Sequence, residues 1–262
     1  YDVKNRLSIS RNHSATHLLQ KALRDVLGTH IQQAGSYVSA DRLRFDYTHF
    51  TAKTAEEKRK VENIVNEKIY ESIDITACEK TIDDARKMGA TALFGEKYGN
   101  IVRVVDMGGY SIELCGGAHL KNTAQIGSFK IVSEGGVASG VRRIEALTGA
   151  GAVKFYQRQE DMLKNVCAAL KTTPDNMVKR VEGLIAEQKT ISKELSALKA
   201  KMAGDAAGNI LEGKTEINGI NVICAEVKGS DGAGLKTMGD ELKNKLGSLV
   251  IARASENEVK VY

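Results

Sequence analysis

The sequence predicts an α+β domain over residues 1–151, an antiparallel helical hairpin or coiled coil over 152–204, and a small α/β domain over 205–262. Three observations lead to this division. Helical periodicity and short apolar runs alternate in the first part. A heptad stripe of apolar residues dominates the second part. The last part contains an Asn-Gly pair between β-forming residues at 218–219, which is typical of a β-hairpin.

The composition excludes several classes of protein. Of the 262 residues, 42% are hydrophobic and 27% are charged, and no long uncharged apolar stretch occurs, so disorder and membrane insertion are disfavoured. The formal net charge of +5 suits a polyanionic partner but equally suits simple solubility. The four cysteines form no CxxC pair, which fits a reducing, cytoplasmic compartment. The N-terminus has neither Met nor a signal segment, so we expect a fragment of a longer polypeptide.

Two helices are expected in the first part. Over residues 14–27 apolar residues recur at helical spacing, and Gly28 stands where a C-terminal cap belongs. Residues 54–72 are predicted to form a charged surface helix. It would turn four apolar residues toward a core, namely Val61, Ile64, Val65 and Ile69.

Strands are expected around these helices. Residues 43–47 alternate apolar and charged side chains, which is the period-two pattern of a half-buried strand. Four short apolar runs separated by glycine-rich turns are expected as further strands: 73–77, 101–105, 111–114 and 128–132.

The second part is predicted to be a helical hairpin. Apolar residues follow a seam of three and four steps from 152 to about 170, and Pro174 then restarts a helix, because proline in a first turn loses no hydrogen bond. From Met177 to Met202, seven of eight seam positions are apolar. We expect a long spacer or dimerising arm, the alternative being two helices packed on a globular core. The helix should end at Gly204-Asp205.

The last part should combine short strands with one helix. A hairpin is expected at 216–221, with its second strand continuing to 227. An amphipathic helix at 235–246 and strands at 249–254 and 258–262 should follow, with a turn at 256–257. Because the sequence ends on a strand, we expect this unit to be incomplete. Three cysteines, Cys78, Cys167 and Cys224, are expected to be small buried hydrophobes.

Two short motifs point to a metal site. His13 and His17 lie four residues apart on a predicted helix, so they share a face and could share a metal, although this spacing is also a frequent coincidence. Cys115 and His119 flank a tight turn with two glycines that could fold a thiolate and an imidazole onto one ion. Together the four side chains match the ligand number and ligand types that zinc prefers.

Three sequence runs resemble the editing domain of bacterial alanyl-tRNA synthetases. They are Arg11-Asn12-His13-Ser14-Ala15-Thr16-His17-Leu18-Leu19, Cys115-Gly116-Gly117-Ala118-His119 and Ser139-Gly140-Val141-Arg142-Arg143-Ile144-Glu145-Ala146. The helical hairpin and the final unit resemble the coiled-coil segment and C-terminal domain of the same family, so the resemblance covers essentially the whole chain. Threonyl-tRNA synthetase editing domains share the histidine and cysteine spacing, but the paired glycines and the third run favour the alanyl family. The chain departs from a complete enzyme of this family because it has no nucleotide-binding region, and we expect its C-terminal domain to lack the last strands and the glycine-rich end.

The resemblance implies hydrolysis of the ester that joins serine or glycine to the terminal ribose of tRNA(Ala). An activation site sized for alanine rejects serine only weakly, whereas a second site that hydrogen-bonds the serine hydroxyl would leave alanine alone. The implied cofactor is one zinc ion, with ATP and magnesium needed only for alanine ligation in the missing N-terminal part. Two alternatives stay open, a non-catalytic zinc-stabilised tRNA-binding module and a threonyl-type editing domain.

The resemblance also implies roles for single residues. Four residues are carried over as the zinc ligands: His13, His17, Cys115 and His119. Four protein ligands would fill the ion, so we expect zinc to organise the pocket rather than to supply a hydroxide nucleophile. Thr16 either recognises the serine hydroxyl or bonds a backbone carbonyl one turn back. Gln33, expected in a loop after the first helix, would position water or substrate.

A glycine-rich loop is expected over residues 133–140, where the acceptor end of tRNA(Ala) would bind. Small residues let RNA approach the backbone, and guanidinium groups can bind phosphates or stack on bases, although such a loop is more often a simple turn. The candidate RNA-binding residues are Gly135, Gly136, Gly140, Arg142 and Arg143. The heptad stripe also leaves open a homodimer through the C-terminal region. His30 and His49 receive no role.

Overall fold

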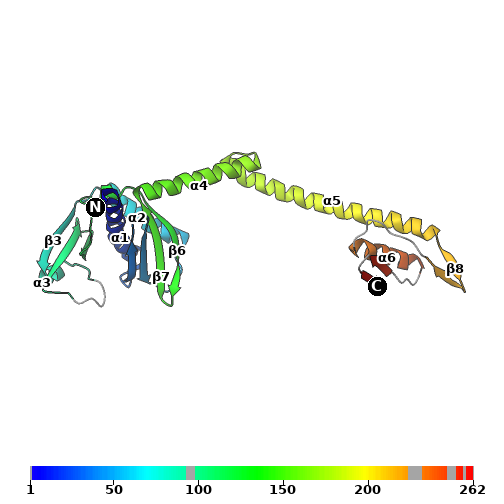
Figure 1. Cartoon of the computed structure of the whole chain (residues 1–262), viewed down its shortest axis with the longest axis horizontal. Coiled ribbons are helices and arrows are strands. Elements are labelled where there is room, and N and C mark those ends of the chain that lie inside the picture. Colours follow the sequence, from blue (N-terminus) through cyan, green and yellow to red (C-terminus); the bar gives the residue numbers. More distant parts are fainter. Residues whose placement is uncertain (1, 93–97, 224–231, 247–251, 256–257, 262) are drawn as a thin grey trace. The chain divides into compact units, whose positions relative to one another are not determined.

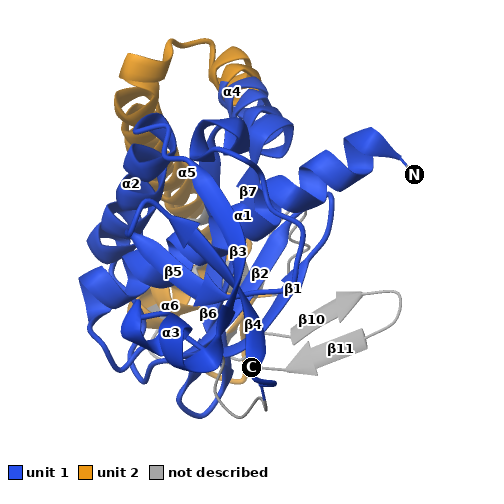
Figure 2. Ribbon diagram, turned by 90° about the vertical axis from the view of Figure 1, so that its left-hand side faces the viewer, with its two compact units in different colours: residues 1–163 blue, residues 164–262 orange. Residues whose placement is uncertain are grey.

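The protein is described by a computed structural model that covers residues 2–92, 98–223, 232–246, 252–255 and 258–261. The chain divides into two compact units, residues 1–163 and 164–262 (Figure 2). Three expectations lie outside the described residues: the strand residues 224–227 with Cys224, the strand residues 249–251, and the turn at 256–257.

A four-stranded antiparallel sheet forms one side of the first unit, with the strand order β1-β2-β7-β6. Its strands are β1 (Gln33–Val38), β2 (Leu43–Thr48), β6 (Phe129–Ala138) and β7 (Val141–Thr148). The strand predicted at 43–47 is confirmed as β2, and its apolar side chains Leu43, Phe45 and Tyr47 are completely buried. The alternation of apolar and charged residues therefore predicted correctly which face of this strand packs against the core.

A three-stranded antiparallel sheet, ordered β3-β4-β5, completes the strands of the first unit. The strands are β3 (Ile75–Thr81), β4 (Ile101–Met107) and β5 (Ser111–Leu114), accompanied by the short helices α3 (Ile82–Lys87) and η1 (Thr123–Ile126). The prediction that Cys78 is buried is wrong, because β3 is an edge strand and Cys78 is exposed on it.

Helix α1 (Val3–Leu27) lies between the two sheets, where it contacts β1, β2 and β7 on one side and β5 on the other (Figure 1). It begins at Val3, earlier than the predicted start at Ser14, because Asp2 caps it by accepting a hydrogen bond from the backbone N–H of Asn5. Gly28 ends it with φ 112°, as predicted. The buried position of α1 places its histidine-bearing face against the second sheet.

Helix α2 (Ala55–Tyr70) also packs against α1. It begins with a capping box between Thr54 and Glu57. The predicted inner face is confirmed, since Val61, Val65 and Ile69 are buried in the same core as the apolar residues of α1. One hydrophobic core thus joins both helices to both sheets and fixes α1 in place.

Two segments that were expected as loops are strands. Gln33 begins β1, opposite Tyr47 of β2, instead of lying in a loop. Residues 133–138 continue β6, with Gly135 opposite Arg143 and Gly136 opposite Arg142. Residues 139 and 140 form the turn between β6 and β7, and Gly140 has the positive φ, 69°, that this turn requires. The glycine content wrongly indicated a loop here, because β7 provides hydrogen-bond partners for the backbone N–H and C=O groups of these residues whatever their side chains.

The second unit begins within helix α4 (Gly149–Leu170) and continues through η2 (Pro174–Asn176), α5 (Met177–Glu212) and α6 (Gly232–Leu246). Its strands are β8 (Thr215–Ile217), β9 (Ile220–Val222), β10 (Ala252–Ser255) and β11 (Glu258–Val261), paired as two antiparallel hairpins. Pro174 occupies a first turn and Cys167 is buried, both as predicted. The Asn218-Gly219 turn between β8 and β9 is also confirmed, with positive φ at both residues.

The predicted end of the long helix at Gly204-Asp205 is wrong. Helix α5 continues to Glu212, and Ala207 is buried against Met238 and Leu242 of α6. Packing against α6 therefore outweighs the low helix propensity of the glycines. In contrast, the seam residues Ile191, Leu195, Leu198 and Met202 are all more than half exposed, and the antiparallel hairpin stays a prediction.

None of the helices in the described part of the chain combines the length and the apolar character that crossing a bilayer requires.

Candidate metal centre

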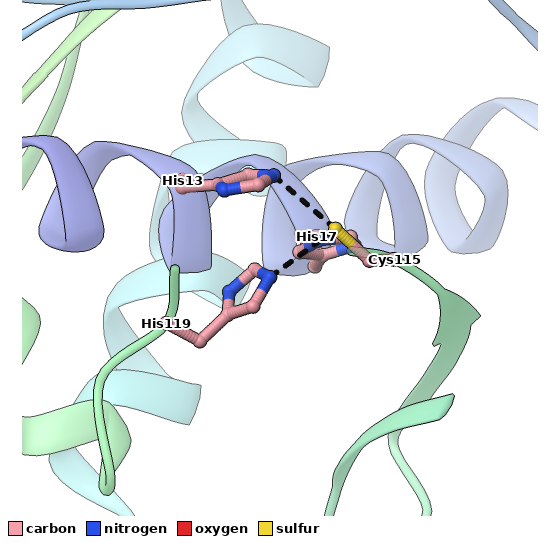
Figure 3. Close-up of side chains that lie close together, drawn as sticks. All are labelled: His13, His17, Cys115 and His119. Carbon is pink, nitrogen blue, oxygen red and sulfur yellow. Dashed lines mark hydrogen bonds between the residues drawn. The ribbon is translucent and has the colours of Figure 1, made fainter. Parts of the chain in front are cut away.

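Four side chains with metal-binding atoms converge beside α1 (Figure 3). His13 and His17 project from successive turns of α1, whereas Cys115 and His119 come from the segment that follows β5. One candidate ligand atom from each residue lies within 4.8 Å of the others. The structure thus brings together the four residues that the sequence singled out, and their role as zinc ligands stays a prediction.

The distances within this group suit a tetrahedral ion. The Sγ atom of Cys115 lies 3.4 Å from Nε2 of His13 and 3.3 Å from Nε2 of His119. In a tetrahedral zinc site, Zn–N bonds of about 2.0 Å and Zn–S bonds of about 2.3 Å separate a nitrogen ligand from a sulfur ligand by about 3.5 Å. Both Sγ–Nε2 distances are close to this value.

The electrostatics of the group favour the form of cysteine that binds metals. Burial opposes the thiolate of Cys115, but hydrogen bonds from His119 and His13 and the nearby charge of His17 outweigh this effect and lower its pKa to about 3. Burial also opposes a charge on His17, yet the nearby carboxylate of Glu113 outweighs it and raises the pKa of His17 to about 10. For His119, burial prevails and lowers the pKa. The lowered pKa of Cys115 favours the thiolate that metal coordination requires.

The two nitrogens of His17 have very different surroundings. Its Nδ1 lies 2.5 Å from Oε2 of Glu113, a carboxylate of β5 that is itself buried. Its Nε2 is buried and has no hydrogen-bond partner among the described residues. A buried polar atom without a partner is unfavourable, so this nitrogen fits the place of a metal ligand.

The turn between Cys115 and His119 is held by Arg103 of β4. Its Nη1 donates to the backbone carbonyls of Cys115 and Gly117, both at 2.8 Å. Gly117 lies so close to His13 that a Cβ atom there would overlap the imidazole ring. The second glycine of the motif is therefore required by space.

Ser14 supports the fourth candidate ligand. Its Oγ lies 3.2 Å from Nδ1 of His119 and accepts a hydrogen bond from the backbone N–H of Leu120. The sequence reasoning missed Ser14, Arg103 and Glu113. For Glu113 a signal existed, since a carboxylate stands within the apolar run at 111–114, at a position where a core strand normally carries an apolar side chain.

Thr16 is buried on α1 and bonds its own helix. Its hydroxyl donates to the backbone carbonyl of Asn12 at 2.8 Å. This is the bond to a carbonyl one turn back that the sequence offered as the alternative to recognition of serine. The hydroxyl oxygen keeps lone pairs that can still accept a hydrogen bond.

Gln33 lies at the start of β1, where its side-chain amide donates to Ser36 Oγ. It lines a cavity of about 120 Å³ together with Gln20, Arg24 and Thr91, among others. Gln20, which the sequence reasoning also missed, lies three residues beyond His17 on α1. It is buried, and its Oε1 atom has no hydrogen-bond partner among the described residues.

Both candidate RNA-binding arginines are paired with carboxylates. Arg143 donates to both oxygens of Asp46, at 2.7 and 2.8 Å, and Arg142 donates to Glu134 at 2.5 Å. Glu134 also faces the completely buried side chain of Lys53. These ion pairs leave the two guanidinium groups fewer donors for phosphate than the sequence alone suggested.

Several known proteins are similar in sequence to this chain. A family model described as threonyl and alanyl tRNA synthetase second additional domain matches residues 102–145, which include Cys115 and His119. Over 260 residues, the chain is 52% identical to the alanine–tRNA ligase of Bacillus anthracis and 53% identical to that of Bacillus cytotoxicus, covering 99% of this chain and 30% of each relative. It is 55% identical over 250 residues to the alanine–tRNA ligase of Acetivibrio thermocellus. The chain spans about 30% of the length of these relatives.

Proposed function

We propose a proofreading role for this chain. The predicted resemblance to alanyl-tRNA synthetase is confirmed by similarity to an alanine–tRNA ligase over 99% of the chain. The reaction is hydrolysis of the ester in mischarged Ser-tRNA(Ala) and Gly-tRNA(Ala). The observation that carries this proposal is the convergence of His13, His17, Cys115 and His119 in the unit that contains the family match. Ligation of alanine, with ATP and magnesium, is proposed for the parts of the whole protein outside this chain.

The same four residues would hold one zinc ion. Zinc bound there would supply a fixed positive charge that organises the pocket beside the ester. Because four protein ligands complete a tetrahedral shell, activation of water would fall to groups of the protein. We assign the positioning of water or substrate to Gln33, which lines the small cavity next to Gln20.

Selectivity against alanine would depend on the hydroxyl group that serine adds. Thr16 already donates its proton to Asn12, so its oxygen is left as an acceptor for the serine hydroxyl. An alanyl ester offers no such donor and would leave the buried polar group without a new partner.

The tRNA(Ala) acceptor end would approach the hairpin of β6 and β7. Gly135, Gly136 and Gly140 offer backbone without side chains, and the free edge of the Arg142 and Arg143 guanidinium groups could meet phosphates. The carboxylates of Glu134 and Asp46 would hold both arginines in fixed orientations before RNA binds.

The test is deacylation of Ser-tRNA(Ala) by this chain and by its Cys115→Ala variant. Loss of the thiolate should lower the rate on the order of 100-fold or more, because second-shell changes alone lower metal affinity or activity by about 10–100-fold. Cys78→Ala is the matched control, since Cys78 is exposed on β3. Equal rates for the Cys115→Ala variant and the unmodified chain would contradict the proposal.

The same assay separates the alternatives. A threonyl-type domain would hydrolyse Ser-tRNA(Thr) in preference to Ser-tRNA(Ala). A non-catalytic module would bind tRNA(Ala) in a salt-sensitive manner without hydrolysing any ester.

We also propose that the chain forms a homodimer through its C-terminal region. The exposed seam of α5, with Ile191, Leu195, Leu198 and Met202, supports this proposal, since apolar residues at heptad spacing pair readily with a second helix.

A further inference from the structure

Glu113 is a carboxylate in an unusual place. It lies on the short strand β5, only 7% exposed, between apolar neighbours, where a charge is unfavourable unless it is paired and hydrogen-bonded. Both of its oxygens have partners. Oε2 meets Nδ1 of His17, and Oε1 accepts a hydrogen bond from Ser111 Oγ at 3.1 Å.

The contact with His17 determines which imidazole nitrogen is left for other partners. A carboxylate at Nδ1 keeps a proton on that nitrogen, so the proton that a metal displaces is the one on Nε2, whose lone pair then binds the ion. Nε2 points into the group of Figure 3 and has no hydrogen-bond partner among the described residues. The ring is therefore held with Nε2 directed at the place where a metal would bind.

We infer that Glu113 is a positioning residue, which orients His17 through Nδ1 so that Nε2 is presented to the metal, and that Ser111 holds Glu113 in turn. This inference rests on the proposed zinc site. Part of the zinc affinity would then depend on Glu113, a residue that does not contact the metal.

A purely structural role for Glu113 makes a different prediction. A buried pair that only joins β5 to α1 would, when broken, lower the stability of the first unit and leave the affinity of the folded protein for zinc unchanged. Metal affinity measured on folded protein therefore separates the two roles.

The experiment measures zinc binding to the 262-residue chain by competition with a chromophoric chelator. The variants are Glu113→Gln, Glu113→Ala and Ser111→Ala, and the matched control is Glu67→Gln, an exposed carboxylate of α2. Circular dichroism confirms that each variant is folded. The absorption spectrum of the cobalt(II)-loaded protein reports the geometry of the ligands.

Glu113→Ala should weaken zinc binding by about 10–100-fold, the usual effect of losing such a supporting partner. Glu113→Gln should lie between Glu113→Ala and the unmodified chain, because its amide oxygen can still accept from Nδ1–H but carries no charge. The cobalt ligand-field bands should shift in the Glu113 variants and stay unchanged in Glu67→Gln.

Wild-type zinc affinity in a folded Glu113→Ala or Glu113→Gln variant would overturn the inference and leave the zinc site intact. If Glu113→Ala does not fold, Ser111→Ala decides, and wild-type affinity in that variant would overturn the inference. Failure of the unmodified chain to bind zinc at all would overturn the zinc site and this inference together.

Discussion

Gly117 shows how strongly a single position is constrained by the candidate metal centre. Its Cα lies against the His13 imidazole, and the Arg103 guanidinium holds its carbonyl in place, so neither the ring nor the turn can move freely. The neighbouring Gly116 has open space where a Cβ atom would be. Two adjacent glycines of one motif therefore have different physical roles.

We expect Gly117→Ala to displace His13 and to weaken zinc binding at least tenfold, since loss of ligand orientation alone has effects of this size. Gly116→Ala should bind zinc as the unmodified chain does, and it serves as the control. Zinc content after dialysis against a chelator is the measurement. Equal retention of zinc by both variants would contradict the steric argument.

Asp46 shows how a residue of the sheet responds to pH. Hydrogen bonds from Arg143 lower its pKa, outweighing burial, which acts in the opposite direction. A carboxyl group whose pKa is lower in the folded protein stabilises the fold fully above its unfolded pKa of about 3.9. This contribution is lost as the pH falls through the lower, folded value.

Asp46→Asn should therefore lower the free energy of unfolding at pH 7 by about 1.5–3 kcal/mol, the range for hydrogen bonds to charged groups. The difference from the unmodified chain should shrink as the pH falls below about 4. Urea unfolding at pH 7, 5 and 3 measures it. A difference that stays constant over this range would show that Asp46 does not titrate in the predicted way.

At the scale of elements, α2 protects an exposed edge of the four-stranded sheet. Strand β6 lies at the end of the order β1-β2-β7-β6, so its outer backbone groups have no neighbouring strand. Asn66 of α2 accepts from the backbone N–H of Phe129 and donates to its carbonyl, both at 2.9 Å. Glu62 accepts from the N–H of Ile131. Side chains of a helix thus replace the missing strand.

Asn66→Ala should lower the free energy of unfolding by about 1–3 kcal/mol, because it leaves two backbone groups of Phe129 without partners. Asn63→Ala, at an exposed position of the same helix, should change it by less than about 0.5 kcal/mol. Chemical denaturation monitored by circular dichroism compares the two. Equal effects would mean that the bonds of Asn66 do not support the edge strand.

At the scale of the whole molecule, the proposed dimer depends on the exposed seam of α5. Replacing Ile191 and Leu198 together by Lys should convert a dimer to a monomer, because like charges would meet across the seam. Sedimentation equilibrium measures the mass, and zinc content checks that the first unit is unaffected. A monomeric mass for the unmodified chain would refute the proposed homodimer.

The sequence predicted the fold well where a pattern is local. Strand β2, helix α2 and the Asn218-Gly219 turn all follow from the period of the side chains or from the φ angles that particular residues tolerate. It failed where partners distant in sequence decide. Residues 133–138 became a strand because β7 pairs with them, and α5 passed Gly204 because α6 packs against Ala207.

For the candidate site, the sequence alone determined the types of candidate ligand and the resemblance to alanyl-tRNA synthetase, because both depend on short runs of residues. Only the tertiary structure showed that Cys115 lies beside the imidazoles of α1. It also showed that Arg142 and Arg143 are already paired with carboxylates. Finally, it placed Glu113 against His17 and Ser14 against His119. The physical reason is distance along the chain. Glu113 lies 96 residues from His17, so no local pattern could connect them until the fold placed β5 against α1.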